Sequence, residues 1–146
     1  MDGIAVDAGW LREIEDVDEA DSFARVQFLQ RLNDRQVALL LDYDGHIAKE
    51  YQRNLLPRSF GRKFFVLRMK FGPLMYFSGQ PISRCRVALV KDGFHSDDVP
   101  YVAVAQRGRG AYLTHEAKHC QPGRKRIIAS ECGVIVGTHI DLISCL

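Results

Sequence analysis

The stretch Gly3-Ile4-Ala5-Val6-Asp7-Ala8-Gly9 decides the fold of this chain. Its small and branched apolar residues run directly into a carboxylate, and a glycine follows two positions later. A short apolar run bounded by a turn signal predicts a buried strand. Because open α/β sheets bind their ligands at the carboxyl ends of their strands, the stretch predicts a ligand site that includes Asp7.

Three further apolar runs, at residues 37–41, 111–114 and 134–136, also predict buried strands. The first runs into Asp42, and the second is followed closely by Glu116. Helical patterns separate these runs, which favours a parallel sheet with helices on both faces. We therefore expect one α/β domain over residues 1–146, a three-layer α/β/α sandwich with a mainly parallel central sheet of four or five strands.

Helices are expected where apolar residues recur at helical spacing and where caps or breakers mark an end. Residues 86–90 are instead expected to form a short strand or extended piece. The expected helical segments are 10–14, 23–34, 46–56, 61–77 with a break or kink at Gly72-Pro73, 96–108, 124–132 and 139–146.

The composition is that of an ordinary soluble protein, with 47% apolar and 26% charged residues in 146. No apolar run approaches the length of a membrane span, and no basic region leads into an apolar stretch at the N-terminus. We therefore expect a cytoplasmic protein with no membrane partner. Because no two of the four cysteines form a CxxC pair, buried free thiols are expected rather than disulfides.

The charge is unevenly distributed along the chain. Residues 1–50 hold 12 acidic and 5 basic residues, whereas residues 51–146 hold 6 acidic and 15 basic residues. A basic C-terminal two-thirds favours an anionic partner, with nucleic acid the first candidate, although a solvated basic face would have the same composition.

Three of the predicted strands end in acids, namely Asp7, Asp42 and Glu116. In a parallel sheet these ends share one edge, and the neighbouring helices could bring Glu50 and Asp98 to it. Clustered carboxylates repel one another unless a cation lies between them. Mg²⁺ prefers oxygen ligands and keeps several waters, and it can activate water for attack on a phosphodiester. The pattern is therefore that of a metal-dependent nuclease.

Four segments in order resemble the motifs of PIN domains. Residues 4–7 resemble the opening strand with its metal-binding Asp, and residues 48–55 resemble a helix whose Glu, here Glu50, precedes an aromatic residue. Residues 98–105 resemble the Asp that opens an Ala-rich helix, and residues 113–116 are similar to a strand that ends in Thr, any residue and an acid. The resemblance covers nearly the whole chain.

This resemblance implies a Mg²⁺- or Mn²⁺-dependent ribonuclease, a kind of protein often found as the toxin of a bacterial toxin–antitoxin pair. It assigns Asp7, Glu50, Asp98 and Glu116 to the catalytic metal site and Thr114 to its support. RNA is then the expected substrate, and an antitoxin protein or a second copy of the chain are further candidate partners.

Two residues depart from the family pattern. Gly9 stands where the family usually has Asn or a similar polar residue, and Glu116 stands where it usually has Asp. The first hypothesis is an active endonuclease. The second is a degenerate PIN-like domain that binds nucleic acid or a protein without cleaving. A third hypothesis is a small-molecule phosphohydrolase. It is less favoured because the sequence contains no P-loop and no covalent-aspartate motif.

Several residues near these motifs have open roles. Asp97 is interpreted mainly as a helix cap together with Ser96, with a water-mediated metal ligand as the alternative. His115 could touch a phosphate beside the site. His115 and His119 are four residues apart, but without further ligands a zinc site is not favoured, and surface or loop roles are expected.

Basic side chains would contact phosphates and supply affinity without sequence specificity. The candidates for these contacts are Arg58, Arg62, Lys63, Arg107 and Arg109.

Overall fold

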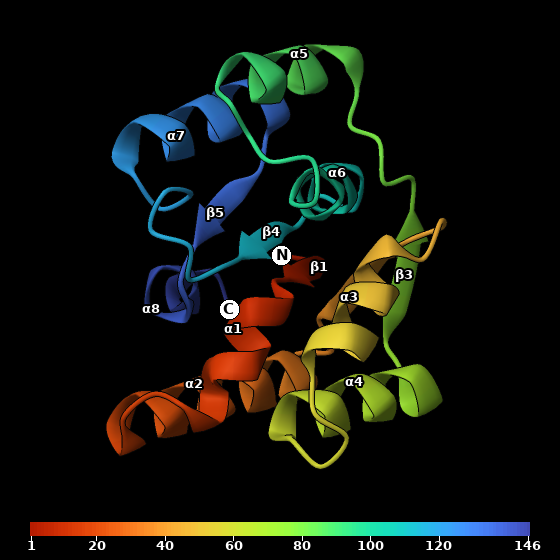
Figure 1. Ribbon diagram of the computed structural model, residues 1–146, viewed down its shortest axis with the longest axis vertical. Coiled ribbons are helices and arrows are strands. Elements are labelled where there is room, and N and C mark those ends of the chain that lie inside the picture. Colours follow the sequence, from red (N-terminus) through yellow and green to blue (C-terminus); the bar gives the residue numbers. More distant parts are fainter.

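Five parallel strands form one sheet at the centre of the molecule (Figure 1). The structure is a computed structural model that describes residues 1–146. The strand order is β3-β2-β1-β4-β5, so the predicted α/β class with a parallel sheet is confirmed. The strands are β1 (Gly3–Val6), β2 (Ala38–Asp42), β3 (Leu74–Phe77), β4 (Ala111–Leu113) and β5 (Ile135–Gly137).

Helices cover both faces of this sheet, as a three-layer sandwich requires. Figure 1 shows α5, α6 and α7 on one side and α1, α2 and α4 on the other. Helix α6 packs across β1, β2, β3 and β4. None of the helices is long and apolar enough to cross a membrane. The helical elements are α1 (Ala8–Arg12), η1 (Glu13–Glu15), α2 (Glu19–Asp34), α3 (His46–Asn54), α4 (Phe60–Phe71), α5 (Ser83–Lys91), α6 (Val99–Arg107), α7 (Pro122–Ile127), η2 (Ile128–Cys132), α8 (His139–Leu142) and η3 (Ile143–Cys145).

The strand order creates a switch point beside β1. Ile4 of β1 pairs with Leu39 of β2 on one side and with Ala111 of β4 on the other. The chain passes from β1 to β2 and β3, and then returns across β1 to β4 and β5. At such a point the connections leave the two neighbouring strands in opposite directions, and ligands bind in the crevice between them. Asp7 directly follows β1 at this switch point.

Both central strands are buried along their length, which explains their unbroken apolar sequences. Every residue of β1 and of β2 is buried, as is typical of parallel strands covered on both faces. A single cluster of 35 buried side chains surrounds them. This core holds the carboxyl ends of the strands in place and thereby positions the residues that follow them.

The predicted helix over 61–77 is only partly correct. Helix α4 ends at Phe71, where Gly72 has a φ of 66° and Pro73 cannot continue the helical hydrogen bonding. Leu74–Phe77 then forms β3, which pairs with β2 from Leu74↔Leu39 onward. The strand was not foreseen because the open edge of β2, rather than a local pattern, determines it.

The predicted strand over 86–90 is wrong, because these residues lie within helix α5. Cys85 and Leu89 are buried, four residues apart, whereas Val87 and Val90 are exposed. This is helical spacing, and the branched valines that favour a strand lie on the solvent side.

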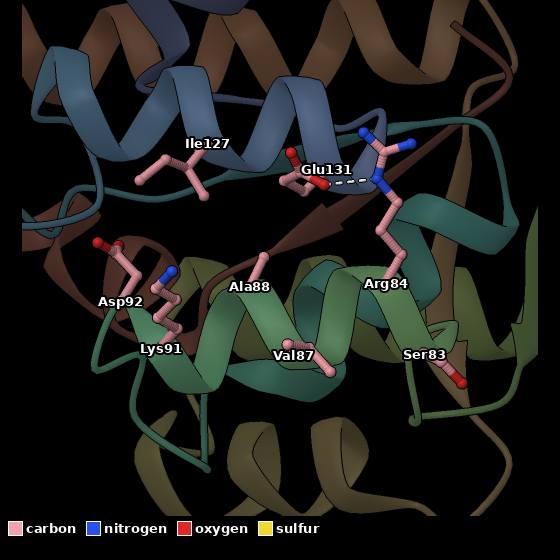
Figure 2. A pocket seen from close by; sticks show the side chains of 8 residues that line it. All are labelled: Ser83, Arg84, Val87, Ala88, Lys91, Asp92, Ile127 and Glu131. Atoms are coloured by element: carbon pink, nitrogen blue, oxygen red, sulfur yellow. Dashed lines mark hydrogen bonds and ion pairs between the residues drawn. The ribbon is translucent and has the colours of Figure 1, made fainter.

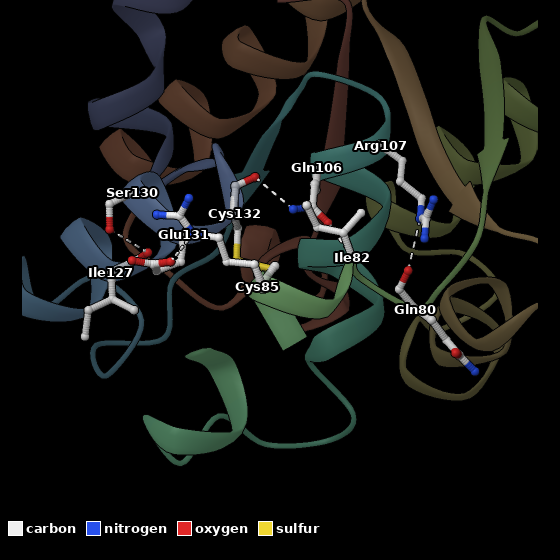
Figure 3. Close-up of a disulfide and its surroundings, with 10 residues drawn as sticks. Gln80, Ile82, Cys85, Gln106, Arg107, Ile127, Ser130, Glu131 and Cys132 are labelled. Carbon is white, nitrogen blue, oxygen red and sulfur yellow. Dashed lines mark hydrogen bonds and ion pairs between the residues drawn. A yellow bond between two sulfur atoms is a disulfide. The ribbon is translucent and has the colours of Figure 1, made fainter. Parts of the chain in front are cut away.

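The expectation of four free cysteines is also wrong. Cys85 of α5 and Cys132 of η2 form a disulfide, although 47 positions separate them (Figure 3). The two elements pack side by side, and this proximity could not be read from cysteine spacing. Cys120 and Cys145 are free.

Candidate active site

Asp7 is the buried centre of the candidate site. It follows β1 directly and caps helix α1, because its Oδ1 accepts the Gly9 N–H at 2.7 Å. Its Oδ2 accepts hydrogen bonds from the Tyr112 hydroxyl at 2.9 Å and from Thr114 Oγ1 at 3.1 Å. The carboxylate is thus held by β1, α1 and the end of β4, at the switch point of the sheet.

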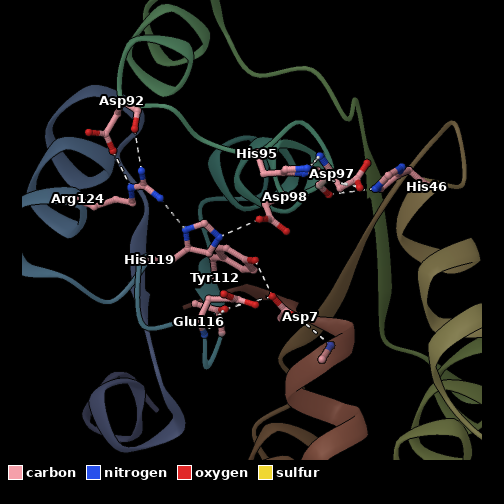
Figure 4. A network of polar contacts seen from close by, with 12 residues as sticks. Asp7, His46, Asp92, His95, Asp97, Asp98, Tyr112, Glu116, His119 and Arg124 are labelled. Atoms are coloured by element: carbon pink, nitrogen blue, oxygen red, sulfur yellow. Dashed lines mark hydrogen bonds and ion pairs between the residues drawn. The ribbon is translucent and has the colours of Figure 1, made fainter.

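Tyr112 lies close to two of the expected metal ligands. Burial first, and then the charges of Asp7 and Asp98, raise the pKa of Tyr112 well above its ordinary value of 10. The phenol therefore stays protonated and donates to Asp7. Figure 4 shows Tyr112 between Asp7 and Asp98. The two carboxylates, 91 positions apart in sequence, therefore lie in the same part of the structure.

Asp42, the acid at the end of β2, hydrogen-bonds to the start of helix α3. It is 2% exposed, and its carboxylate accepts the backbone N–H groups of His46 at 2.9 Å and Ile47 at 2.8 Å. These are free donors at the start of α3, so the side chain caps that helix. Asp42 therefore positions the helix that carries Glu50.

A second contact ties α3 to β1. The Tyr51 hydroxyl donates to the Val6 carbonyl at 2.6 Å, and Tyr51 is completely buried. Burial and then the charge of Asp7 raise the pKa of Tyr51 well above 10, so this donor keeps its proton. Glu50 is the preceding residue, and it lies close enough to Tyr101, as Asp7 does, to raise the pKa of that phenol. Asp7 and Glu50 therefore flank the same part of the site.

Asp98 begins helix α6 but does not cap it with its side chain. Its Oδ2 lies 3.0 Å from Nε2 of His119, whose side chain is completely buried. His119 lies in the loop after β4, which agrees with one of the two expected roles, but its burial contradicts the other, a surface role. The expected cap by Asp97 is wrong too, because Asp98 occupies the cap position and the exposed Asp97 carboxylate lies 3.7 Å from His95.

Thr114 connects Asp7 to Glu116 by hydrogen bonds. Its hydroxyl donates to Asp7 and accepts the Glu116 N–H at 3.1 Å. The Thr114 hydroxyl thus links the Glu116 backbone to the Asp7 carboxylate. The Glu116 side chain is partly exposed. A carboxylate with this access can reach a bound ion directly or through water.

His115 explains why residue 9 is a glycine. A Cβ at Gly9 would lie 2.7 Å from Cε1 of His115, which is closer than side-chain atoms approach one another. The imidazole therefore occupies space that a polar side chain at position 9 would take. Its Nε2 lies 3.2 Å from Glu13 Oε1. The imidazole thus lies beside Gly9 and close to the Asp7 carboxylate.

The donor chemistry of this region fits Mg²⁺ or Mn²⁺ better than a softer metal. The four acids brought to this edge, Asp7, Glu50, Asp98 and Glu116, offer only carboxylate oxygens. No three His, Cys, Asp or Glu side chains lie close enough together to form a ready-made metal cage. Mg²⁺ does not need one, because it is usually held by one or two carboxylates with waters and phosphate oxygens.

The predicted basic residues divide into two groups. Arg58 and Lys63 are exposed beyond α3, whereas Arg62 donates to the carbonyls of Gln52 and Leu55 at 3.1 Å. Arg62 therefore joins the α3–α4 connection and is less free to meet a ligand.

Arg107 and Arg109 lie at the other end of the sheet. They precede the amino end of β4, whereas Asp7 and Glu116 follow the carboxyl ends of their strands. Arg107 also donates to the Gln80 carbonyl at 3.0 Å. The backbones of both arginines thus lie away from the carboxylates, although the Arg107 side chain reaches the segment that follows the carboxyl end of β3.

A cavity of about 690 Å³ lies elsewhere, between α5 and the α7–η2 segment (Figure 2). Its apolar lining includes Val87 and Ile127, and an ion pair between Arg84 and Glu131 crosses it. None of the four expected metal ligands lines it, so we place the candidate site at the carboxylates, where acidic and phenolic groups converge.

Sequence reasoning missed Tyr112 and His119. A signal for Tyr112 existed, because it precedes Thr114 by two residues along a strand and so shares its face. For His119 there was none, since its partner Asp98 is 21 positions away, with helix α6 and strand β4 between them. In comparisons with known proteins, no family model, no curated protein and no solved structure matches this chain.

Proposed function

We propose that this protein is a metal-dependent endonuclease that hydrolyses phosphodiester bonds, with single-stranded RNA as its substrate. One observation carries the proposal: a buried carboxylate, Asp7, is held by three donors at the switch point of a parallel sheet, with Asp98 across Tyr112 from it. This supports the proposal because open α/β sheets bind their substrates at the carboxyl ends of the strands beside the switch point.

In this proposal Asp7 and Asp98 hold Mg²⁺ or Mn²⁺, and Glu50 and Glu116 complete the site directly or through water. The ion, when bound, would lower the pKa of a water molecule and neutralise charge on the phosphate. Arg58 and Lys63, which are exposed beyond the Glu50 helix, would guide the phosphate backbone.

The test is cleavage of a labelled single-stranded RNA with Mn²⁺, Mg²⁺ or EDTA, with the matching DNA strand in parallel. Asp7→Asn should remove cleavage, because an amide offers a weaker ligand and places a donor against Tyr112 and Thr114. Asp44→Asn is the matched control, since Asp44 is an exposed acid in the β2–α3 turn, and it should cleave like the wild type. Circular dichroism confirms that each variant is folded. Cutting that persists in EDTA and in Asp7→Asn would refute the metal mechanism.

A second candidate function is binding without cleavage. It is favoured because no three His, Cys, Asp or Glu side chains lie close enough together to hold a metal ion. Fluorescence anisotropy with the same RNA separates the two functions. Binding with no cleavage in either metal would support the second candidate.

A further inference from the structure

A chain of polar contacts runs from Asp98 through the buried His119 to the partly exposed pair of Arg124 and Asp92 (Figure 4). Nε2 of His119 lies 3.0 Å from Asp98 Oδ2, and Nδ1 of the same ring lies 3.3 Å from Nη1 of Arg124. Arg124 in turn donates to Asp92, to its Oδ2 and to its carbonyl, each at 2.7 Å. Asp92, Arg124 and His119 are thus linked in series behind a candidate metal ligand.

These contacts determine which ring nitrogen of His119 carries the proton. A guanidinium has only donors, so the nitrogen that faces Arg124 must accept. In a neutral imidazole the other nitrogen, Nε2, then holds the hydrogen and donates it to Asp98. Asp92 fixes the guanidinium by two hydrogen bonds, and this leaves Arg124 little freedom to release the ring.

Aromatic packing keeps the imidazole from turning. The His119 ring stacks on Phe94, with 4.4 Å between ring centroids and 23° between planes, and its centroid lies 6.1 Å from that of Tyr112. The Arg124 guanidinium also lies 5.4 Å from the Phe94 ring. Phe94 therefore supports both members of the pair.

The Asp98 side chain does not cap helix α6, although Asp98 occupies the N-cap position. An Asp at a helix N-cap ordinarily accepts a backbone N–H from the first turn, yet the Asp98 side chain makes no such bond to α6. Its carboxylate is turned to a buried side chain from the loop after β4 instead. The first turn of α6 leaves it no donor, because Pro100 has no N–H and the Tyr101 N–H bonds to the Asp98 carbonyl at 3.2 Å. The Asp98 carboxylate is therefore free to meet His119.

We propose that His119 is a positioning residue that orients the Asp98 carboxylate for metal binding, in a tautomer set by Arg124. The inference rests on the proposed metal-dependent function. His119 would act on the ion only through Asp98, as residues that hydrogen-bond to metal ligands do. The free second oxygen of Asp98 would then be aimed towards Asp7.

The first test measures Mn²⁺ affinity by electron paramagnetic resonance, without RNA. His119→Leu should weaken Mn²⁺ binding about 10–100-fold, the usual effect of losing such a supporting hydrogen bond. His119→Gln keeps a donor near the position of Nε2 and should recover most of the affinity. Loss of a merely structural residue would not be rescued in this way. Arg126→Gln, an exposed arginine on the same helix as Arg124, should bind like the wild type.

The second test leaves His119 in place, in case His119→Leu does not fold. Long-range ¹H–¹⁵N correlation spectra should show the Nε2–H tautomer of His119 in the wild type. In Arg124→Met the same spectra should show a mixture of tautomers, with weaker Mn²⁺ binding. An Nδ1–H tautomer in the wild type would overturn the inference.

The outcomes also separate this inference from the function on which it rests. If the wild type binds Mn²⁺ and His119→Leu, folded, binds it equally well, the positioning role is refuted and the metal site stands. If the wild type binds no Mn²⁺ at all, the metal-dependent function itself is refuted, and the positioning role with it.

Discussion

At the scale of single residues, Asp7 is held before any ligand arrives. One oxygen accepts the Gly9 N–H and the other accepts two hydroxyl groups, so the carboxylate cannot turn without breaking a hydrogen bond. Hydrogen bonds to a charged acceptor in a buried setting are stronger than those between neutral groups. The free energy of binding an ion at this residue therefore does not include a large cost for ordering the ligand.

The Tyr112 hydroxyl should contribute measurably to stability through this bond. Tyr112→Phe removes one donor to a buried carboxylate, so we expect the free energy of unfolding to fall by about 1.5–3 kcal/mol. Urea denaturation at pH 7, followed by circular dichroism, measures it. Tyr43→Phe is the matched control, because Tyr43 is 73% exposed, and it should leave the urea midpoint unchanged. An unchanged midpoint for Tyr112→Phe would contradict the role assigned to this bond.

At the scale of elements, two helices bring acids to the sheet by contacts that lie outside the motifs themselves. Helix α3 is anchored by the Asp42 cap and by the bond from Tyr51 to Val6. Helix α6 begins at Asp98, which is held from the loop after β4 by His119. The positions of Glu50 and Asp98 therefore depend on tertiary contacts with β1 and β4.

The disulfide between α5 and η2 should stabilise the fold by restricting the unfolded chain. Reduction, or Cys85→Ser, should lower the free energy of unfolding by about 2–4 kcal/mol, the range expected for a loop of this length. Urea denaturation with and without dithiothreitol measures the loss, and thiol counting under denaturing conditions confirms the pairing. Cys120→Ser, a change at a free cysteine, should show the same response to dithiothreitol as the wild type. Four titratable thiols in the untreated protein would disprove the bond.

At the scale of the whole molecule, three buried phenols surround the candidate site and share one electrostatic property. Burial and the nearby carboxylates raise the pKa of Tyr51, Tyr101 and Tyr112 above 10, so all three stay protonated in the folded chain. In the unfolded chain they ionise near pH 10. The three phenols therefore do not reduce the free energy of unfolding below pH 10. Above pH 10 the free energy of unfolding falls as the pH rises towards the raised pKa values of the folded state.

Stability should accordingly fall steeply at alkaline pH. Three phenols that ionise only on unfolding lower the free energy of unfolding by about 4 kcal/mol per pH unit above pH 10. Urea denaturation at intervals from pH 8 to 11 measures this slope. Tyr101→Phe should reduce it by about one third, whereas Tyr76→Phe, at a partly exposed tyrosine, should not change it. Equal stability at pH 9 and pH 11 would contradict the assignment.

Much of the fold followed from local patterns. The apolar run before Asp7, the runs that became β2, β4 and β5, and the helix that carries Glu50 were all predicted, because fully buried strands and capped helices leave unbroken or periodic patterns. Leu74–Phe77 was missed because half of its residues are exposed and only the edge of β2 makes it a strand. The helix at 83–91 was missed because it contains two exposed valines, and β-branched residues are typical of strands.

The sequence by itself determined that Asp7 ends a buried strand, since four consecutive apolar residues followed by an acid and a glycine have few other stable arrangements. Only the tertiary structure decided what surrounds Asp7. Tyr112 and Thr114 reach Asp7 because the sheet reverses its direction of growth between β1 and β4, and this joins residues more than 100 positions apart. His119 in turn contacts Asp98, 21 positions away. Local patterns encode which face of an element is buried, but not which distant side chain will pack against it.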